Sequence, residues 1–506
     1  MTAGRTFQSL LATAKGDSIA LLAPDARPLT FAAFRDLVAR TVASLNHFGV
    51  GRNDRVAIVL PNGPEMATAF VSVASGATSA PLNPSYKADE FEFYMDDLKA
   101  KALIVEAGSA SPAILAANKL GIAVLTLTPE PEAGAGAFTL SGGTAIGAAA
   151  FPGFAEPGDI ALILHTSGTT SRPKIVPLTQ HNVATSADNI ARAVDFSEAD
   201  RGLNIMPLFH IHGLIAGILA PLSRGGSIYC TAGFNALKFF AQMDESKPSW
   251  YTAVPTMHQA ILTRAPHNAD VIARHPLRFI RSSSSSMPPQ VIGELEAVFH
   301  APVIEAYGMT EASHQMASNP LHGVRKPGAV GIPAGPEVAI MSETGEILGA
   351  DEVGEIVIRG ENVTAGYENN PKANAEAFVN GWFRTGDQGV MDTDGYFRLT
   401  GRLKEIINRG GEKVSPREVD EAIMDHPAVL QVVTFAVPHD KLGEDIAAAV
   451  VLREGASATE QDLKSFLAQR LAAFKTPRKI LFLPEIPKGA TGKLQRIGLA
   501  EKLGLA

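Results

Sequence analysis

The stretch TSGTTSRPK, from Thr166 to Lys174, has the residue types of a phosphate-binding loop. Small and hydroxyl residues expose backbone N–H groups and hydroxyls to an anion, and Lys174 adds a positive charge. A Walker loop has glycine directly before its lysine and Ser or Thr after it, whereas Pro173 and Ile175 flank Lys174 here. The sequence therefore predicts a nucleotide phosphate cradle of another kind, formed by Thr166, Ser167, Gly168, Thr169, Thr170 and Lys174.

A surface turn of the same composition is the alternative interpretation of this loop, and the rest of the chain decides between the two. Four further strings follow in order: EAYGMTE at 305–311, TGD at 385–387, GRLKEIINRGGEKVSP at 401–416 and PKGATGKLQR at 487–496. In this order the five strings resemble the adenylate-forming superfamily, which contains acyl-CoA synthetases, luciferases and the adenylation domains of peptide synthetases. The resemblance covers nearly the whole chain, and it favours the cradle.

The resemblance implies a nucleotide-binding role for EAYGMTE. Tyr307 would stack on adenine beside Glu305 and Ala306, Thr310 would bond the α-phosphate, and Glu311 would give magnesium a hard oxygen ligand. We expect a strand that ends at Tyr307, a turn at Gly308 and then a helix capped by Thr310.

The resemblance also assigns the two motifs that follow. Asp387 of TGD would accept hydrogen bonds from both ribose hydroxyls, and Arg402 of GRLKE would bond the ribose or a phosphate. Alone, a TGD triplet is a common turn. Followed by GRLKE, it indicates a nucleotide site.

Formation of an acyl-adenylate requires a carboxylate to attack the α-phosphate of ATP, so cations should converge on the phosphates. The candidates are Lys174, a magnesium ion and Lys493 in the PKGATGKLQR loop. Lys493 matches the lysine that reaches from the lid into the active site during adenylation in the family. Its alternative interpretation is an ordinary surface lysine.

The second half-reaction needs a thiol to replace the pyrophosphate, so the lid must rearrange. Lys404 matches the family's hinge position, and Gly410 and Gly411 match the segment that the rotated lid presents to the thiol. No carrier-protein sequence follows the lysine loop, so free coenzyme A is the expected acceptor and no carrier protein is expected. ATP, magnesium and coenzyme A are the expected cofactors and co-substrates, without a prosthetic group.

The acyl pocket is predicted from a serine run and from histidines. Where many relatives carry small apolar residues, this chain has SSSSSM at 282–287, and buried hydroxyls disfavour a hydrocarbon tail by about 1–3 kcal/mol each. His314 follows Glu311 by about one helical turn, and PLFHIHGL adds His210 and His212. We expect Ser284, His314 and His210 to hold the second carboxylate of a short acid.

The combination of FIRSSSSSMPP, EAYGMTEASHQMASNPL and HTSGTTSRPKIVPLTQHN most closely resembles the oxalyl-CoA synthetases, which implies oxalate as the acid. Several alternatives stay open: the histidines line the wall only, the serines form an adenine-contacting turn, or the acid is malonate or a hydroxy acid. A malonate enzyme is expected to use an arginine, and strand alternation alone leaves the direction of Arg281 open. A nucleotide-binding relative without turnover is a further alternative, against which Lys493 and Glu311 argue.

Composition limits the partners. A formal net charge of −8 over 506 residues gives no long-range attraction to nucleic acid or to an anionic membrane. The single cysteine, Cys230, cannot form an intrachain disulfide and is expected to be buried. The N-terminal residues lack the apolar core of a secretory signal and no apolar run has membrane-spanning length, so we expect a cytoplasmic enzyme.

Apolar runs of strand length alternate with helical stretches early in the chain, which is typical of a layered α/β domain. Runs at 56–60 and 102–105 predict strands, whereas 129–150, rich in Gly, Ala and Pro, predicts a loop. The expected fold class is α/β: an N-terminal domain, 1–400, of layered α/β subdomains plus a β-rich subdomain, and a small α+β domain, 401–506. The resemblance implies that the second domain is a mobile lid.

Overall fold

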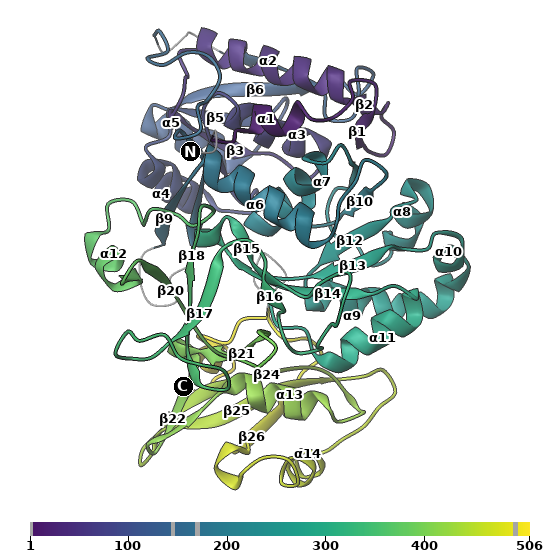
Figure 1. Cartoon of the computed structure of the whole chain (residues 1–506), viewed down its shortest axis with the longest axis vertical. Helices are drawn as coiled ribbons and strands as arrows, with labels where there is room; N and C mark the ends of the chain where they lie inside the picture. The colour runs from purple at the N-terminus through teal and green to yellow at the C-terminus, as the bar shows by residue number, and fades with distance from the viewer. Residues whose placement is uncertain (1–3, 143–146, 167–172, 489–493, 506) are drawn as a thin grey trace.

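The computed structural model describes residues 4–142, 147–166, 173–488 and 494–505. Its first sheet has parallel inner strands and an antiparallel strand at each edge (Figure 1). Val56 and Ile58 face one apolar cluster, and Ala57 and Val59 face another, because both faces of this parallel sheet are covered. In spatial order the strands are β7 (Phe138–Gly142), β6 (Ala123–Pro129), β5 (Ala102–Glu106), β3 (Arg55–Val59), β4 (Thr78–Pro81), β8 (Ile160–Thr166) and β9 (Lys174–Thr179).

Two pairs of helices cover this sheet. Apolar residues of α4 and α5 pack on the face of Ala57, and those of α2 and α3 pack on the face of Val56. The helices of this part are α1 (Phe7–Leu11), α2 (Phe31–His47), α3 (Pro64–Ala74), α4 (Ala88–Leu98) and α5 (Pro112–Leu120).

The predicted loop at 129–150 is partly wrong, because it contains β7. This strand is mostly exposed and carries few apolar residues, so its sequence gives a weak strand signal. It forms by antiparallel pairing with β6, which continues to Pro129. An edge strand of this kind depends on its neighbour more than on its own pattern.

The second sheet carries most of the predicted site. Its central strands are parallel, and β2, β15 and β16 pair antiparallel at its ends. In spatial order the strands are β16 (Ile332–Pro333), β15 (His314–Ser318), β14 (Val303–Met309), β13 (Phe279–Ser282), β12 (Trp250–Ala253), β10 (Arg201–Asn204), β11 (Ser227–Cys230), β1 (Ile19–Leu22) and β2 (Leu29–Thr30). Cys230 is fully buried in β11, as expected.

The second sheet lies between two apolar clusters, and helices cover both of its faces. The first cluster includes α6 and a π-helix, η1 (His212–Leu219), and the second includes α8, α9 and α11. The helices are α6 (Gln180–Ala193), α7 (Ala220–Leu222), α8 (Phe239–Ser246), α9 (Pro255–Arg264), α10 (Ala269–Arg274) and α11 (Pro289–Phe299), with a 3₁₀ turn, η2 (Ala265–Asn268).

The helix expected after Tyr307 does not form. Strand β14 continues through Gly308 to Met309, a single 3₁₀ turn (η3, Thr310–Ala312) follows, and β15 returns antiparallel to β14. Ser313 and His314 have positive φ angles of 49° and 96°, which end the helical turn. His314 therefore lies at the start of a strand and not one helical turn beyond Glu311.

The β-rich subdomain and the C-terminal domain meet at a short connection. Gly401 and Arg402 still pair with β20, and the exposed Lys404 lies in the following 3₁₀ turn, η4 (Leu403–Glu405). The subdomain contains β17 (Glu337–Met341), β18 (Val353–Arg359), α12 (Pro371–Ala377), β19 (Phe378–Val379), β20 (Trp382–Met391) and β21 (Phe397–Arg402). The C-terminal domain contains β22 (Ile407–Arg409), β23 (Glu412–Val414), α13 (Pro416–Met424), β24 (Val429–His439), β25 (Gly443–Leu452), α14 (Glu460–Leu467), η5 (Ala473–Lys475), β26 (Lys479–Phe482) and α15 (Leu499–Lys502).

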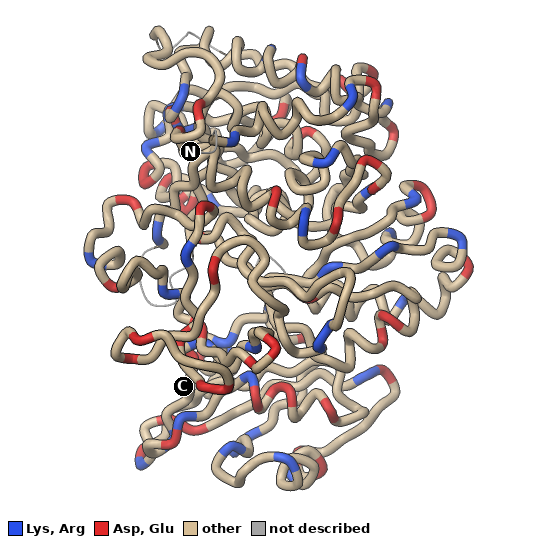
Figure 2. Tube along the Cα trace, in the orientation of Figure 1, with Lys and Arg blue, Asp and Glu red and all other residues tan. Residues whose placement is uncertain are grey.

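Charged side chains of both signs are interspersed along the chain (Figure 2). No helix within the described ranges is long and apolar enough to cross a membrane. A small anion must therefore be held by a local group of residues, not by an extended basic surface.

Gly331 is a position where the fold requires glycine. Its φ is +92°, and a Cβ there would lie 1.9–2.1 Å from backbone atoms of Ser318 and Asn319. Gly331→Ala should lower the free energy of unfolding by about 3 kcal/mol or more. The cost of the left-handed backbone conformation and the cost of the clash with neighbouring backbone atoms add together.

Gly381→Ala is the matched control, since Gly381 has φ +80° and no atom within 4 Å of its added Cβ. It should cost only about 1–2 kcal/mol. Urea unfolding of both variants measures the difference. Equal losses would contradict the steric argument.

Candidate active site

The ends of the phosphate cradle lie opposite each other on a β-hairpin. Thr166 ends β8, Lys174 begins β9, and the two residues are paired in register. Ser167, Gly168, Thr169 and Thr170 lie outside the described residues, and so does Lys493. The pairing of β8 with β9 therefore places the two ends of the predicted cradle side by side.

Lys174 lies beside a tyrosine and a buried carboxylate, which we call the Glu311 cluster (Lys174, Glu311 and Tyr367). The Lys174 Nζ is 4.2 Å from the centre of the Tyr367 ring, and the Tyr367 hydroxyl donates to Glu311 Oε1 at 2.8 Å. Burial raises the pKa of Glu311, and the hydrogen bond from Tyr367 and the charge of Lys174 oppose that rise. A cation and a hard oxygen ligand beside a phosphate loop suit a polyphosphate with its magnesium ion.

Sequence analysis missed Tyr367. It lies in TAGYENN, whose residues are common in turns, so no local pattern marks it. The backbone places it: Thr364 N–H donates to the carbonyl of Glu311 at 2.7 Å, and Glu368 N–H donates to Ile175 next to Lys174. A segment distant in sequence thus contacts both η3 and β9.

Tyr307, Asp387 and Arg402 form a second group, the Asp387 cluster. The Tyr307 hydroxyl donates to Asp387 Oδ2 at 2.5 Å, and Arg402 Nε donates to Oδ1 at 2.8 Å. Burial and the Asp387 charge hold the pKa of Tyr307 well above its usual range, so its hydroxyl stays protonated. A carboxylate oriented by two donors keeps lone pairs that can accept from sugar hydroxyls.

Glu305 and Ala306 connect β14 to the serine run and to the C-terminal domain. Glu305 Oε1 accepts from the Met287 N–H at 3.1 Å, and the Ala306 carbonyl accepts from Ser283 Oγ at 2.9 Å. Burial raises the pKa of Glu305 to about 7, against the attraction of Arg417 on α13. Glu305 therefore lies where the two domains touch.

The predicted acid-binding residues Ser284 and His314 lie on either side of His212. The His212 Nδ1 is 2.9 Å from Ser284 Oγ, and the His212 and His314 rings stack with centroids 5.0 Å apart. We call His212, Ser284 and His314 the histidine cluster. The contact shown for His210 is different, because its Nδ1 accepts from the backbone N–H of His212.

His212 was absent from the predicted set, although it lies in the same string as His210. His210 lies in the bend before η1, and the shown contact with the Ser284 hydroxyl is made by His212, the first residue of η1. His212 begins the π-helix η1, a rare conformation that is frequent at functional sites. Its direction could not be obtained from an ordinary helical period.

The histidine cluster carries backbone strain. Ser284 and His314 have φ angles of 74° and 96°, and such angles cost of order 1–3 kcal/mol each outside glycine. Gly308 permits the arrangement, because a Cβ there would lie 1.8 Å from the His314 carbonyl oxygen. Strain that persists beside converging imidazole and hydroxyl groups indicates a binding site.

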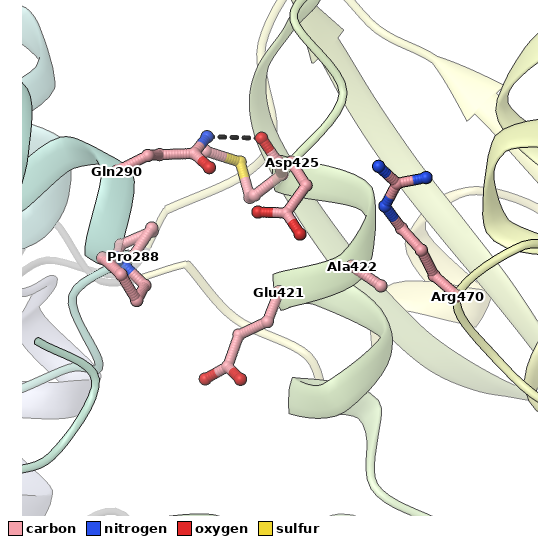
Figure 3. A pocket seen from close by; sticks show the side chains of 8 residues that line it. Pro288, Gln290, Glu421, Ala422, Asp425 and Arg470 are labelled. Atoms are coloured by element: carbon pink, nitrogen blue, oxygen red, sulfur yellow. Dashed lines mark hydrogen bonds between the residues drawn. The ribbon is translucent and has the colours of Figure 1, made fainter.

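A pocket at the domain boundary has the wrong charge for a small acid (Figure 3). It lies between the start of α11 and α13, where the Gln290 amide donates to the Met424 carbonyl. The carboxylates of Glu421 and Asp425 outnumber the guanidinium of Arg470 in its lining. An anionic substrate is better accommodated by the histidine cluster.

The chain is similar to known enzymes over most of its length. The profile of AMP-binding enzymes matches residues 10–368, and the profile of the AMP-binding enzyme C-terminal domain matches 418–493. The chain is 47% identical to the oxalate–CoA ligase of Arabidopsis thaliana over 475 residues, 92% of each chain. It is 44% identical to the oxalate–CoA ligase of Saccharomyces cerevisiae over 477 residues, 89% of this chain and 87% of the yeast protein.

The fold also matches a solved structure. ATP-bound MatB from Rhodopseudomonas palustris has a TM-score of 0.88 to this chain at 28% identity and covers 99% of both chains. The expected α/β class, with a large N-terminal and a small C-terminal part, is confirmed. The boundary between 400 and 401 stays a prediction.

Tyr367→Phe tests the Glu311 cluster. The ring over Lys174 remains while the hydrogen bond to Glu311 is lost, and a bond to a charged group is worth about 1.5–3 kcal/mol. We expect kcat/KM for ATP to fall roughly ten- to a hundredfold in a pyrophosphate-release assay.

Tyr396→Phe is a closely matched control. Lys326 Nζ lies 4.5 Å from the centre of the Tyr396 ring, and the hydroxyl donates to a backbone carbonyl, that of Val324. This variant should keep its ATP kinetics. If both variants lost the same activity, the Glu311 cluster would have no special role in ATP use.

Proposed function

This chain belongs to the AMP-binding enzyme family, and from that premise we propose that it ligates oxalate to coenzyme A with conversion of ATP to AMP and pyrophosphate. The observation that carries the proposal is the histidine cluster, in which His212, Ser284 and His314 converge without a hydrocarbon side chain between His212 and either partner. The names of the two relatives point to the same acid.

In the first half-reaction an oxalate oxygen attacks the α-phosphorus of ATP. A P–O bond forms, the bond to the bridging oxygen breaks, and its electron pair leaves with pyrophosphate. The enzyme contributes mainly position and charge. Lys174 is proposed to neutralise phosphate charge, and Thr310, half-buried beside Glu311, is proposed to bond the α-phosphate.

Glu311 is the residue proposed to hold the magnesium ion that accompanies ATP. Its carboxylate is buried and oriented by Tyr367, and a hard oxygen ligand suits that ion. The ion supplies further neutralisation of the phosphates when bound.

The Asp387 cluster is proposed to bind the ribose, with the Tyr307 ring against adenine. Lys493, which lies outside the described residues, is proposed to reach the α-phosphate in this step. The thiol of coenzyme A then attacks the oxalyl carbonyl: a C–S bond forms, the bond from the carbonyl carbon to the AMP phosphate oxygen breaks, AMP leaves with that electron pair, and the thiol proton is released to solvent. Rotation at Lys404, in the turn between β21 and β22, is proposed to exchange the lid surfaces.

Oxalate fits this chemistry because its second carboxylate is directly bonded to the first. A group that binds the second carboxylate therefore also orients the attacking one. Imidazole and hydroxyl donors stabilise the negative charge of the second carboxylate by hydrogen bonds. The alkyl group of acetate would leave these donors without a hydrogen-bond acceptor. Malonate differs from oxalate by one CH₂ between its two carboxylates. Its exclusion therefore depends only on the distance between the two carboxylate-binding positions.

Pyrophosphate release with purified protein, ATP and a panel of acids tests the function. The panel contains oxalate, malonate, glycolate, acetate and benzoate, and mass spectrometry of the CoA product identifies the thioester. Oxalate should give the highest kcat/KM. A higher value for malonate or glycolate would reassign the acid, and no release with any acid would favour a nucleotide-binding relative without turnover.

His314→Ala and Ser284→Ala should each lower kcat/KM for oxalate roughly ten- to a hundredfold while KM for ATP changes little. Acetate has no second carboxylate, so its low rate should change little. His322→Ala, an exposed histidine elsewhere, is the control. Equal losses for oxalate and acetate would show that these residues position the reacting carboxylate or the nucleotide instead.

A further inference from the structure

Arg281 is a fully buried guanidinium without a carboxylate partner. Its exposed fraction is 1%, and within the described part of the chain no acidic side chain forms an ion pair with it. Burial lowers the pKa of Arg281 to about 9, so it remains charged at neutral pH. An unpaired buried charge is costly, and packing alone does not explain its presence.

The sheet directs Arg281 towards the histidine cluster. Arg281 on β13 is in register with Thr252 on β12, so both side chains lie on the same face of the sheet. Arg281 Nη1 lies 3.4 Å from His212 Nε2, and Nη2 donates to Gln315 Oε1 at 3.0 Å. The direction that the sequence left open is thereby resolved.

The contact with Arg281 assigns the proton of His212. A guanidinium has only donors, so His212 Nε2 must be the acceptor in their hydrogen bond. Thr252 Oγ1, 2.7 Å from the same nitrogen, can donate as well. The proton of the neutral imidazole then lies on Nδ1 and is donated to Ser284 Oγ at 2.9 Å.

Ser284 is the last residue in the chain of hydrogen bonds that runs from Arg281 through His212. Because its oxygen accepts from His212, its hydroxyl proton is directed to another acceptor. The donors run from Arg281 through His212 to Ser284 and end at the site where an acid would bind. An ionised carboxylate is an acceptor only, so it matches this polarity, whereas an amide or a hydroxyl matches it in part.

We propose that Arg281 is a positioning residue that fixes His212 as a donor to Ser284, and so makes the histidine cluster select acids whose second group is a carboxylate. The inference rests on the proposed acid–CoA ligase activity for its substrate, but its first test needs no substrate.

The first test measures the tautomer of His212 in the unmodified protein. Two-bond ¹H–¹⁵N spectra of protein labelled with ¹⁵N-histidine should show His212 as a neutral imidazole with its proton on Nδ1, assigned by the signals lost in His212→Asn. A proton on Nε2 would overturn the proposal, whether or not the protein uses oxalate. This test also holds if the Arg281 variants fail to fold.

The second test compares Arg281→Lys with Arg281→Met. Lysine is also a cation that only donates, whereas methionine fills similar space without charge. Arg281→Met should lower kcat/KM for oxalate roughly ten- to a hundredfold with KM for ATP unchanged, and Arg281→Lys should retain more of that activity. Higher activity in the methionine variant would show a packing role and overturn the proposal.

Oxamate, which carries an amide in place of the second carboxylate, reports the polarity of the site. The unmodified enzyme should prefer oxalate to oxamate at least tenfold, and Arg281→Met should reduce that ratio. If the ratio were unchanged while both activities fell, Arg281 would support the site without setting its selectivity. Activity with another acid only, together with the Nδ1 tautomer, would overturn the oxalate assignment and leave the tautomer assignment standing.

Discussion

The in-register parallel pairing of β12, β13 and β14 is the constraint on which the proposed chemistry depends. It places Thr252 beside Arg281, and it brings Ser282 beside Glu305 on the next strand. Ligands of open α/β sheets bind outside the carboxyl ends of the strands, where Ser284 and Thr310 follow β13 and β14. A shift of one residue in the pairing of β12 with β13 would turn Arg281 away from Thr252 and His212.

The Asp387 cluster links nucleotide binding to the connection between the domains. Asp387 on β20 is in register with Arg402 on β21, and the two side chains form an ion pair two residues before Lys404. Asp387 raises the pKa of Arg402, so the pair is held together by charge. A ribose that competed for Asp387 would therefore act on Arg402, two residues before the proposed hinge.

Sequence reasoning was most successful where local patterns dominate. Apolar runs predicted β3 and β5 because both faces of the sheet are buried, and the order of five motifs identified the family. The helix after Tyr307 was wrong because antiparallel pairing of β15 with β14 prevails there, helped by Gly308. That contact lies between residues six apart with unusual φ angles, which no periodicity reveals.

The site residues that sequence reasoning missed share a physical cause. Tyr367 reaches Glu311 from a turn 56 residues away, and His212 owes its direction to a π-helix. Neither contact leaves a local pattern. The nucleotide motifs were easier to find because a phosphate loop is contiguous, whereas a small acid is held by single side chains from several strands and turns.

The histidine cluster combines two features that are costly in the free protein. Ser284 and His314 hold strained backbone, and Arg281 is buried without a carboxylate. Replacement of such a charge by an apolar residue is often neutral or stabilising, so stability alone would favour its loss. An acid with a second negative charge brings acceptors to the end of the donor chain and places its charge near the guanidinium. A neutral tail would offer no acceptors to these donors, so the cost in the free enzyme and the proposed selectivity for a diacid have one physical origin.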